Sequence, residues 1–302
     1  MAPLGTTVAV AGRTLTLTNL DKVLYPEVGF TKAQVIDYYA RIAPVMVPHV
    51  AGRALTFHRF PNGVDQKGFF EKNCPQHRPD WVPVSIGPGT PPPRSCRIEE
   101  PATLVWAGNQ AAIEIHAPMA LADDLDAPRM VVFDLDPGPP AAMRECAVIA
   151  RHIRDVLASV GLEAWPKTSG SKGLQLYLPV NGPLTHEHAS SFALAVAQVL
   201  ERQLPGQVLS VMTKAQRTGK VFVDWSQNSF HKTTIGVYSL RARPRPTVST
   251  PVTWDEVDAA ADGEAELRFE AADVLARVDA LGDLFAPTLT RRQELPQPAG
   301  RT

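Results

Sequence analysis

The sequence predicts an α+β fold built around a split-βαβ sheet, and three observations lead to this class. Residues 130–133 form a short run of large apolar side chains, which is typical of a buried strand. Leucines alternate with other residues over 174–178, which predicts a strand with one buried face. Residues 141–160 and 186–203 have the length and pattern of helices and flank this second strand.

The order of the remaining elements completes the arrangement β-α-β-β-α-β, with one extra strand near the end. The first helix is expected to end before Gly161, and the second is stopped by Pro205-Gly206. This order is that of ferredoxin-like and RRM-like folds. The other predicted elements are a strand over 164–168, a turn over 169–173 and strands over 208–212 and 221–225.

The rest of the chain is expected to join this sheet in one domain. Thr31 is a plausible N-cap for a helix, because apolar residues then recur at helical spacing. The many prolines of residues 78–102 predict loop structure there. The expected parts are a domain over 1–290, with an N-terminal α/β part over 14–125, an RRM-like part over 126–250, a helical segment over 251–290 and a flexible tail over 291–302.

Composition indicates a globular, soluble protein, for which a cytoplasmic enzyme is the default expectation, and the net charge weakens the case for general nucleic-acid binding. Of 302 residues, 44% are hydrophobic and 20% charged, with a net charge of −1. No apolar run reaches the roughly 18 residues that a membrane span requires. Residues 214–245 nevertheless contain seven lysines or arginines against the single acid Asp224. This segment is either a phosphate-binding face or a solvated basic loop.

The three cysteines, Cys74, Cys96 and Cys146, are few and odd in number. They therefore argue against a disulfide framework and fit a reducing compartment. Cys74-Pro-Gln-His77 has a spacing found in zinc sites, but no second ligand pair is evident in the sequence.

Two carboxylates follow the apolar run, in the segment Asp134-Leu-Asp136. Residues at i and i+2 of a strand point to the same face, so these acids lie side by side. Adjacent buried acids repel each other unless a cation lies between them, and hard divalent ions take oxygen ligands. The alternative is an ordinary Asp-Pro-Gly turn at the end of a strand.

Two further segments fit the same chemistry. Asp224 is the single acid of an otherwise apolar strand, and a third carboxylate is typical of two-metal phosphoryl transfer. The small residues of Ser169-Gly-Ser-Lys-Gly173 permit a backbone anion nest, to which Lys172 adds charge. The alternatives are an edge-strand aspartate and a plain hairpin turn. The split-βαβ topology makes the first and third strands neighbours, so we expect these groups to converge on a triphosphate and its metal.

With these segments in view, the chain resembles the archaeo-eukaryotic primase superfamily. It resembles specifically the polymerase domain of bacterial ligase D and its stand-alone relatives in non-homologous end joining, over residues 14–290. The core motifs are Val132-Phe-Asp-Leu-Asp-Pro-Gly138, Thr168-Ser-Gly-Ser-Lys-Gly173 and Val221-Phe-Val-Asp-Trp-Ser-Gln227. The outer motifs are Leu17-Thr-Asn-Leu-Asp-Lys-Val-Leu-Tyr-Pro26, Pro61-Asn-Gly-Val-Asp-Gln66, Gly68-Phe-Phe-Glu-Lys72, Glu114-Ile-His116 and Tyr238-Ser-Leu-Arg-Ala-Arg243.

The resemblance implies a primase-polymerase fold, in which the RRM-like catalytic sheet packs against the N-terminal α/β part. It implies that Asp134, Asp136 and Asp224 are catalytic and bind two Mn²⁺ or Mg²⁺ ions. It also implies a nucleoside triphosphate as substrate, with ribonucleotides preferred. The residues implied at the nucleotide are His116, Ser169, Ser171, Lys172, Gln175, Arg217, Gln227 and Arg241.

The resemblance further implies DNA contacts at gapped or broken ends. Asn19, Lys22 and Lys32 match a pocket for the 5′-phosphate of a downstream strand, although both lysines also fit an ordinary surface. Phe69 and Phe70 match aromatics that stack on template bases, although adjacent aromatics also occur in cores. A further DNA contact, Arg59, is implied beside them.

Two positions depart from the family pattern. Gln175 stands where the family motif has histidine, and a glutamine can donate a hydrogen bond but cannot carry charge. His58 stands where close relatives have a basic residue. We expect these departures to alter triphosphate affinity, metal preference or rate, but not to abolish activity.

The expected reaction is in-line attack of a primer 3′-hydroxyl on the α-phosphate. The chain lacks a Lys-x-Asp-Gly ligase motif. Sealing is therefore expected to come from another domain or protein, and the resemblance implies Ku and an ATP-dependent DNA ligase as partners. A two-metal nuclease and a non-catalytic end-binding module are the alternatives, because they share the aspartates and the basic groove respectively.

Overall fold

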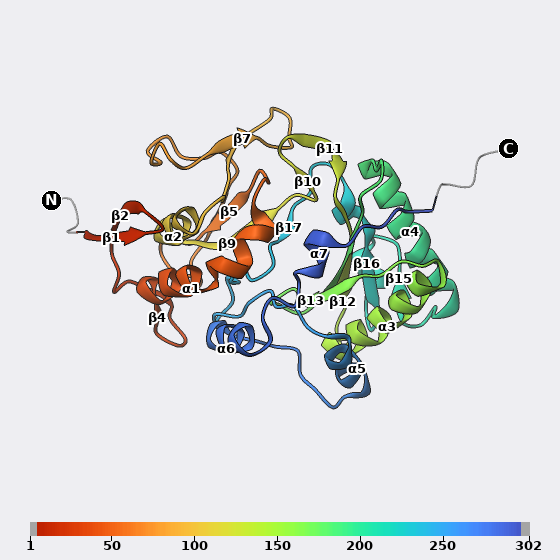
Figure 1. Cartoon of the computed structure of the whole chain (residues 1–302). Helices are drawn as coiled ribbons and strands as arrows, with labels where there is room; N and C mark the ends of the chain where they lie inside the picture. The colour runs from red at the N-terminus through yellow and green to blue at the C-terminus, as the bar shows by residue number, and fades with distance from the viewer. Residues whose placement is uncertain (1–4, 297–302) are drawn as a thin grey trace. The chain divides into compact units, whose positions relative to one another are not determined.

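The computed structural model describes residues 5–296, and the chain divides into two units that are considered separately (Figure 1). The first unit extends to Pro118 and also includes 233–249 and 269–283. The second unit contains 119–232, 250–268 and the residues from 284 onward. Each unit is therefore assembled from segments that are distant in sequence.

A five-stranded sheet in the order β13-β14-β12-β16-β15 forms the centre of the second unit. The central strand β12 is antiparallel to both of its neighbours, and β15 is parallel to β16. The first and third strands of the split-βαβ unit, β12 and β14, are neighbours as predicted. The extra strand β16 is inserted between the first and fourth strands, β12 and β15. The strands are β12 (Met130–Pro137), β13 (Trp165–Thr168), β14 (Leu174–Pro179), β15 (Val208–Leu209) and β16 (Val221–Asp224).

Two helices pack on this sheet, α3 (Met143–Ser159) and α4 (His186–Gln203), and both were predicted. The side chain of Thr185 caps α4 by accepting a hydrogen bond from the His188 N–H. Phe133 of β12 meets Phe192 of α4 edge-on, so this face of β12 is turned toward the helices. Because side chains alternate along a strand, the residues on either side of Phe133 belong to the other face.

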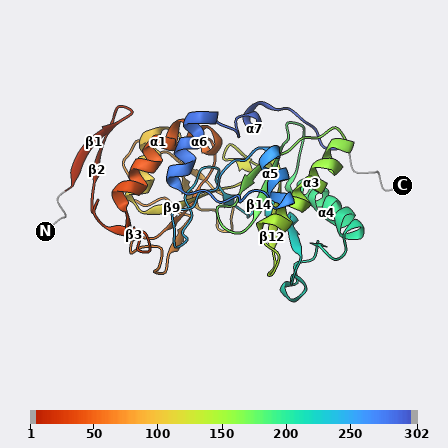
Figure 2. The same ribbon diagram turned by 90° about the horizontal axis from the view of Figure 1, so that it is seen from below.

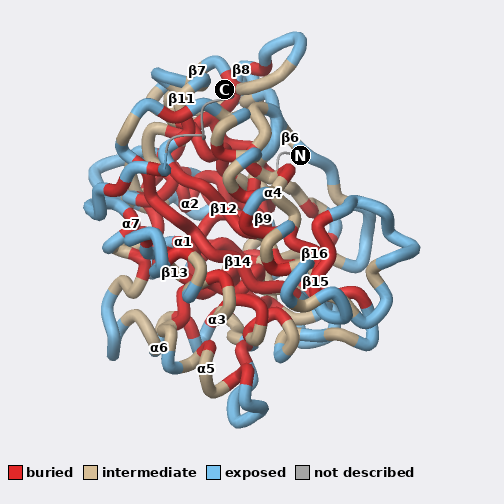
Figure 3. The backbone as a smooth tube through the Cα atoms, turned by 90° about the vertical axis from the view of Figure 1, so that its right-hand side faces the viewer, coloured by how far each residue is buried: buried red, intermediate tan, exposed pale blue. Residues whose placement is uncertain are grey.

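Two details of the predicted strands are wrong. Every residue of β14 is buried, rather than one face of it (Figure 3). The face that carries Tyr177 is covered by the C-terminal segment, where the ring centroid of Phe285 lies 5.4 Å from that of Tyr177. The strand predicted over 208–212 ends at Leu209, where its pairing with β16 stops.

The segment predicted to be helical over 251–290 is interrupted and is shared between the two units. In the second unit, α5 (Trp254–Asp262) lies beside α3 (Figure 2). Two hydrogen bonds between Arg154 of α3 and Asp258 of α5 join the two helices in an ion pair. The short helix α7 (Pro287–Thr290) is followed by residues that we expected to be flexible. That expectation is wrong up to residue 296, because Gln293 is buried and donates to backbone oxygens of Glu163 and Pro179. The remainder of the expected tail lies outside the described residues.

The first unit contains a four-stranded sheet in the order β17-β9-β5-β6. Its strands are antiparallel to their neighbours. They are β5 (Thr56–Arg59), β6 (Phe69–Glu71), β9 (Ala112–Ala117) and β17 (Thr234–Ile235). Short antiparallel pairs lie outside this sheet: β1 (Thr6–Val10) with β2 (Arg13–Leu17), β3 (Val23–Tyr25) with β4 (Phe30–Thr31), β7 (Val84–Ile86) with β8 (Arg94–Cys96) and, in the second unit, β10 (Ala120–Leu121) with β11 (Asp124–Pro128).

The helices of the first unit are α1 (Lys32–Val50), α2 (Pro101–Asn109) and α6 (Ala271–Leu281). Thr31 caps α1 as predicted, in a reciprocal capping box with Gln34. Helix α2 was not predicted, and residues 78–102 also contain the β7–β8 pair. Figure 2 shows α6 lying beside α1.

Residues 233–249 pair with the first unit, although we expected them in the catalytic part over 126–250. Strand β17 joins the edge of β9, and the Ser239 hydroxyl accepts from the Ile115 N–H. The buried Tyr38 hydroxyl donates to the carbonyl of Tyr238. These contacts attach the segment that carries Arg241 to the N-terminal sheet.

The cysteine expectation is also wrong: Cys74 and Cys96 form a disulfide. The Cys74 N–H donates to the carbonyl of Arg94, two residues before Cys96, so backbone pairing brings the two thiols together. A zinc site at Cys74 and His77 is excluded, because the Cys74 sulfur is bonded to Cys96. Cys146 is buried in α3.

The helices in the described part of the chain are all too short or too polar to span a lipid bilayer.

Candidate active site

Three carboxylates converge on one face of the sheet in the second unit. Asp134 and Asp136 alternate along β12 with the fully buried Leu135. The register of β12 with β16 places Asp224 directly opposite Asp134. All three aspartates are partly exposed, whereas their strand neighbours are buried, so the acids share an accessible face.

The charge on this face is concentrated enough to perturb Asp134. Burial is the largest cause, and together with the charges of Asp136 and Asp224 it raises the pKa of Asp134 to about 7. Two cationic groups lie near Asp136: Lys172 Nζ is 3.9 Å and Arg217 Nη1 is 3.8 Å from its carboxylate oxygens. Three oxygen-donor groups with excess negative charge match the preference of Mg²⁺ and Mn²⁺.

The turn of residues 169–173 joins β13 to β14 beside the end of β12. The N–H groups of Ser171 and Gly173 both point to the Ser169 hydroxyl oxygen, at 3.3 and 3.1 Å. Lys172 Nζ donates to the carbonyl of Pro137. The turn thus has the inward-pointing amides of an anion nest, and two of these amides donate hydrogen bonds to the Ser169 hydroxyl oxygen.

Gln175 and Gln227 contact the aspartates directly. Gln175 stands opposite Asp134 in β14 and donates to its Oδ1 at 3.1 Å. Gln227 donates to Asp224 Oδ2 at 3.2 Å, and the Ser226 hydroxyl donates to Asp224 Oδ1 at 2.6 Å. The other amide atom of Gln227, Oε1, is buried and has no hydrogen-bond partner within residues 5–296.

Arg217 follows a short helical turn over Lys214–Gln216. Its guanidinium lies 4.0 Å from the ring centroid of Phe222, and Nη2 donates to the carbonyl of Met212. These contacts hold the charge of Arg217 near Asp136. The structure therefore gathers eight of the predicted residues in the second unit: Asp134, Asp136, Ser169, Ser171, Lys172, Gln175, Arg217 and Asp224, with Gln227 attached to Asp224.

Sequence reasoning missed Lys167, which is fully buried in β13. Its Nζ donates to Gln175 Oε1 at 2.5 Å. The only sequence signal is a lysine within the short strand that precedes the turn, and its partner follows from the strand register rather than from the sequence.

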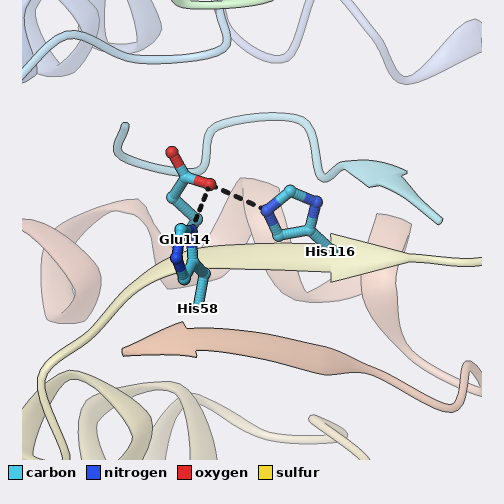
Figure 4. Close-up of side chains that lie close together, drawn as sticks. All are labelled: His58, Glu114 and His116. Carbon is cyan, nitrogen blue, oxygen red and sulfur yellow. Dashed lines mark hydrogen bonds and ion pairs between the residues drawn. The ribbon is translucent and has the colours of Figure 1, made fainter. Parts of the chain in front are cut away.

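Two predicted nucleotide-binding residues, His116 and Arg241, belong to the first unit. Both form hydrogen bonds with the carboxylate of Glu114. Figure 4 shows Glu114 Oε2 between His58 Nδ1, at 3.1 Å, and His116 Nε2, at 2.8 Å. Glu114 Oε1 accepts from Arg241 Nε at 2.9 Å and from the Ala242 N–H at 3.0 Å. Glu114, a residue to which sequence analysis gave no role, is therefore the centre of this cluster.

Electrostatics explain the state of the cluster. Burial favours the neutral form of Glu114, but hydrogen bonds from His116 and His58 and the charge of Arg241 outweigh it and hold the pKa of Glu114 far below its usual value. Burial lowers the pKa of His116, although the Glu114 carboxylate opposes that shift. Glu114 is therefore ionised at neutral pH.

By donor type, His58, Glu114 and His116 also make a possible metal site, since their ligand atoms lie within 4.8 Å of one another. An ionised carboxylate only accepts hydrogen bonds, so each histidine nitrogen facing Glu114 carries a proton. An ion here would displace both protons and lie beside the Arg241 guanidinium. We interpret the cluster as a hydrogen-bonded network that positions Arg241 and His116.

A polar pocket of about 250 Å³ lies elsewhere in the first unit. Lys32 Nζ donates to the carbonyl of Thr18 at 2.6 Å, and Lys22 Nζ donates to Asn62 Oδ1 at 3.1 Å. Burial, then the charges of Lys22 and Arg59, lower the pKa of Lys32 to about 8. No acidic side chain lines the pocket among the described residues, and its lining includes all four predicted polar DNA contacts: Asn19, Lys22, Lys32 and Arg59.

Arg59 connects this pocket to the aromatic pair. It forms an ion pair with Glu71 at 2.7 Å, and its guanidinium lies 5.3 Å from the ring centroid of Phe69. Phe69 and Phe70 are 46% and 58% exposed, so neither belongs to the core. The alternative that these phenylalanines are core residues is wrong.

Comparison with known proteins gives matches along most of the chain. The model of the LigD primase-polymerase domain matches residues 31–285. The multifunctional non-homologous end joining protein LigD of Mycolicibacterium smegmatis is 47% identical over 277 residues, covering 90% of this chain and 35% of that protein. The bifunctional non-homologous end joining protein LigD of Bacillus subtilis is 32% identical over 244 residues, covering 80% of this chain and 39% of that protein.

A solved structure agrees with these matches. The polymerase domain from Mycobacterium tuberculosis ligase D, solved in complex with DNA, superposes with a TM-score of 0.85 at 43% identity. The match covers 91% of this chain and 98% of that domain. The predicted α+β fold and the stated resemblance are thereby confirmed.

Proposed function

The chain belongs to the family of LigD primase-polymerase domains, which are polymerase-type nucleotidyltransferases, and we propose that it extends primers and fills gaps at DNA breaks in a template-dependent manner. The proposed substrates are ribo- or deoxynucleoside triphosphates, with ribonucleotides preferred. The proposed DNA substrate carries a 5′-phosphate on the strand downstream of the gap. Convergence of three carboxylates on one sheet face is the observation that carries the proposal.

Two Mn²⁺ or Mg²⁺ ions would be held by Asp134 and Asp136, with Asp224 as a ligand of the ion on the primer side. The donor set fits such ions, because the three acids are close, accessible and mutually repelling without a cation. When bound, the ions would lower the pKa of the primer 3′-hydroxyl and neutralise the leaving pyrophosphate.

The residues of the chain would bind and orient the triphosphate. Lys172 and Arg217 already lie close to Asp136 and bring positive charge to the metal face. The Ser169 and Ser171 hydroxyls would donate to phosphate oxygens. The turn amides that donate to Ser169 Oγ would then be free to donate to the phosphate instead. Gln227, which is held on Asp224, would add an amide contact to the triphosphate. Gln175 would keep Asp134 oriented, and charge on the leaving group would be stabilised by Lys172 and Arg241.

His116 and Arg241 are further proposed nucleotide contacts. The Glu114 carboxylate fixes both side chains, so neither loses much side-chain freedom on binding. His116 is the residue we expect to contribute to the ribonucleotide preference.

The pocket of Asn19, Lys22 and Lys32 would bind the downstream 5′-phosphate. It offers two ammonium groups and amide donors without a competing acid among its described lining residues. Arg59 would add a further contact, and the exposed Phe69 and Phe70 would stack on template bases.

The chain spans 35–39% of the length of the relatives described above, so the wider context is proposed by analogy with them. We propose that the two units act as one catalytic domain over 1–290, in the bacterial cytoplasm. Ku and an ATP-dependent DNA ligase are the proposed partners in non-homologous end joining.

The test is extension of a primer on gapped DNA that carries a downstream 5′-phosphate, with Mn²⁺ or Mg²⁺ and each type of triphosphate. We expect templated addition by the wild type, faster with ribonucleotides, and its loss in Asp136→Asn. Asp155→Asn, on the exposed side of α3, is the matched control and should extend normally. Extension by Asp136→Asn at the wild-type rate would overturn the metal assignment.

Other results would favour the alternative functions. Shortening of the labelled strand would identify a two-metal nuclease. Binding of the 5′-phosphate end without chemistry under any condition would identify an end-binding module.

A further inference from the structure

Lys167 is the most deeply buried cation of the second unit's sheet, with no exposed surface. A buried ammonium group is unfavourable unless it is hydrogen-bonded and offset by negative charge. The role expected for its partner Gln175 from the sequence, a nucleotide contact, does not account for this lysine. The side chains facing Lys167 across the sheet are therefore informative.

The strand registers place Lys167 in a row that crosses four adjacent strands. Lys167 of β13 is opposite Gln175 of β14, and Gln175 is opposite Asp134 of β12. Asp134 is in turn opposite Asp224 of β16. Directly opposed residues of antiparallel strands project from the same face, so the row ends in the carboxylates of the proposed metal site.

Two hydrogen bonds connect the first three residues of the row. Lys167 Nζ donates to Gln175 Oε1 at 2.5 Å, and Gln175 Nε2 donates to Asp134 Oδ1 at 3.1 Å. An ammonium group only donates, so it determines which end of the Gln175 amide faces it. The flipped amide would place its NH₂ group against the ammonium and its oxygen against the carboxylate, and both contacts would be repulsive.

We propose that Lys167 is a positioning residue of the metal site, which fixes the Gln175 amide on Asp134 and supplies positive charge behind the three aspartates. The proposal rests on the proposed function in that it treats these aspartates as the metal ligands.

The departure at Gln175 gives this role a chemical reason. A histidine at this position could both donate to Asp134 and carry a positive charge. Gln175 retains the donor but not the charge. In this chain the charge lies one strand further along the same row, on Lys167.

The first experiment is a double-mutant cycle on metal-free protein. Lys167→Met is introduced into the wild type and into Asp134→Asn, and unfolding by urea is followed in the presence of a chelator. We expect Lys167→Met to decrease the folding equilibrium constant in both backgrounds. The factor of that decrease should be at least about fivefold smaller in Asp134→Asn than in the wild type. Equal losses in both backgrounds would mean that Lys167 only fills space, and the proposal would be overturned.

If Lys167→Met does not fold, a second variant replaces it in the same double-mutant cycle. Gln175→Met removes the bridging amide and leaves Lys167, and the same dependence on Asp134 is expected. Equal losses in the two backgrounds would again contradict the proposal. The unfolding measurement contains no metal, nucleotide or DNA, so its outcome is independent of whether the chain is a polymerase.

The final experiment tests rescue. Lys167→Met alone is expected to decrease templated extension at least about tenfold, and Lys167→Met with Gln175→His to recover most of it, because histidine returns charge and donor to Asp134. If the double variant extended primers no faster than Lys167→Met, the proposal that Lys167 supplies positive charge to the aspartates would be overturned. Extension by the wild type in the same assay reports separately on the proposed function.

Discussion

The imidazole ring of His58 lies flat against the ring of Phe70, with the centroids 4.0 Å apart and the planes 11° apart. The two residues are opposite each other in β5 and β6, so the sheet register produces the stack. On its other side His58 bonds to Glu114, which holds Arg241 and His116. The exposed aromatic platform and the predicted nucleotide-binding residues of this unit therefore share one buried carboxylate.

Removal of the platform should weaken binding to unpaired template. Stacking of one base on an aromatic side chain contributes about 1–3 kcal/mol, so Phe70→Ala should decrease affinity for gapped DNA about tenfold. Affinity for a blunt duplex should change little, and fluorescence anisotropy with both substrates measures the difference. Ile86→Ala removes an equally exposed apolar side chain from β7 and serves as the control. A similar loss on both substrates would contradict template stacking.

The lowered pKa of Lys32 predicts an unusual pH dependence of 5′-phosphate binding. Its pKa is about 8, so the ammonium loses its charge as pH rises from 7 to 9, where an ordinary lysine stays charged. The ratio of affinities for 5′-phosphorylated and 5′-hydroxyl DNA should fall by about fivefold or more across this range. Lys32→Arg should bind with a flat profile over the same range, and a flat wild-type profile would contradict the prediction.

The same shift has a defined sign for stability. Because the folded pKa lies below the unfolded value of 10.5, the unfolded state binds more protons between pH 8 and pH 10.5. The charged Lys32 therefore destabilises the folded state below pH 8. This destabilisation decreases as pH rises from 8 to 10.5, so the free energy of unfolding increases across that range. Urea unfolding of the wild type and Lys32→Met across this range measures the effect.

The sequence allowed much of the catalytic face to be predicted, because strand periodicity alone aligns Asp134 with Asp136. The split-βαβ topology predicted that the strand of these acids neighbours the strand after the phosphate turn, whereas Asp224 lies on the extra strand β16, whose insertion beside β12 that topology does not specify. Lys167 escaped notice because its role depends on being opposite Gln175, and a shift of one residue in the register of β13 would point it to the other face. Register is set by the packing of the whole sheet and is not encoded in a short motif.

The first unit was harder to predict for a related reason. Glu114 gains its role from partners on three segments, namely His58 of β5, His116 of its own strand and Arg241 from a segment more than 120 residues later. The Cys74–Cys96 pairing depends likewise on the alignment of one loop with β8. Long-range contacts of this kind follow from tertiary packing, which a single sequence without internal repeats does not reveal.

The disulfide predicts a measurable difference between oxidised and reduced protein. Its cysteines are 22 residues apart, and closing a loop of this length stabilises the folded state by about 3 kcal/mol in the chain-entropy model. Urea unfolding with and without a reductant should show a decrease of that order in the wild type. Cys96→Ser should be insensitive to the reductant. An equal response of both proteins would mean that the thiols are not paired.

The close approach of Gly173 to β12 provides a test of the geometry of the metal face. A Cβ atom at Gly173 would collide with the backbone oxygen of Leu135, the residue between the two aspartates of β12. Neither backbone segment can yield without moving Asp134 or Asp136 or opening the turn. Gly173→Ala should therefore lower the free energy of unfolding by about 1–3 kcal/mol and reduce templated extension more than tenfold.

Gly206→Ala is the matched control for this substitution, because a Cβ at Gly206 would contact nothing within 4 Å. It should preserve both stability and extension. If Gly173→Ala lowered the free energy of unfolding but extended primers at the wild-type rate, catalysis would tolerate displacement of Asp134 and Asp136. The prediction that their geometry limits extension would then be wrong. If Gly173→Ala lost extension while the Mn²⁺-induced rise in melting temperature stayed at the wild-type value, the collision would act on the triphosphate turn rather than on the metal ligands.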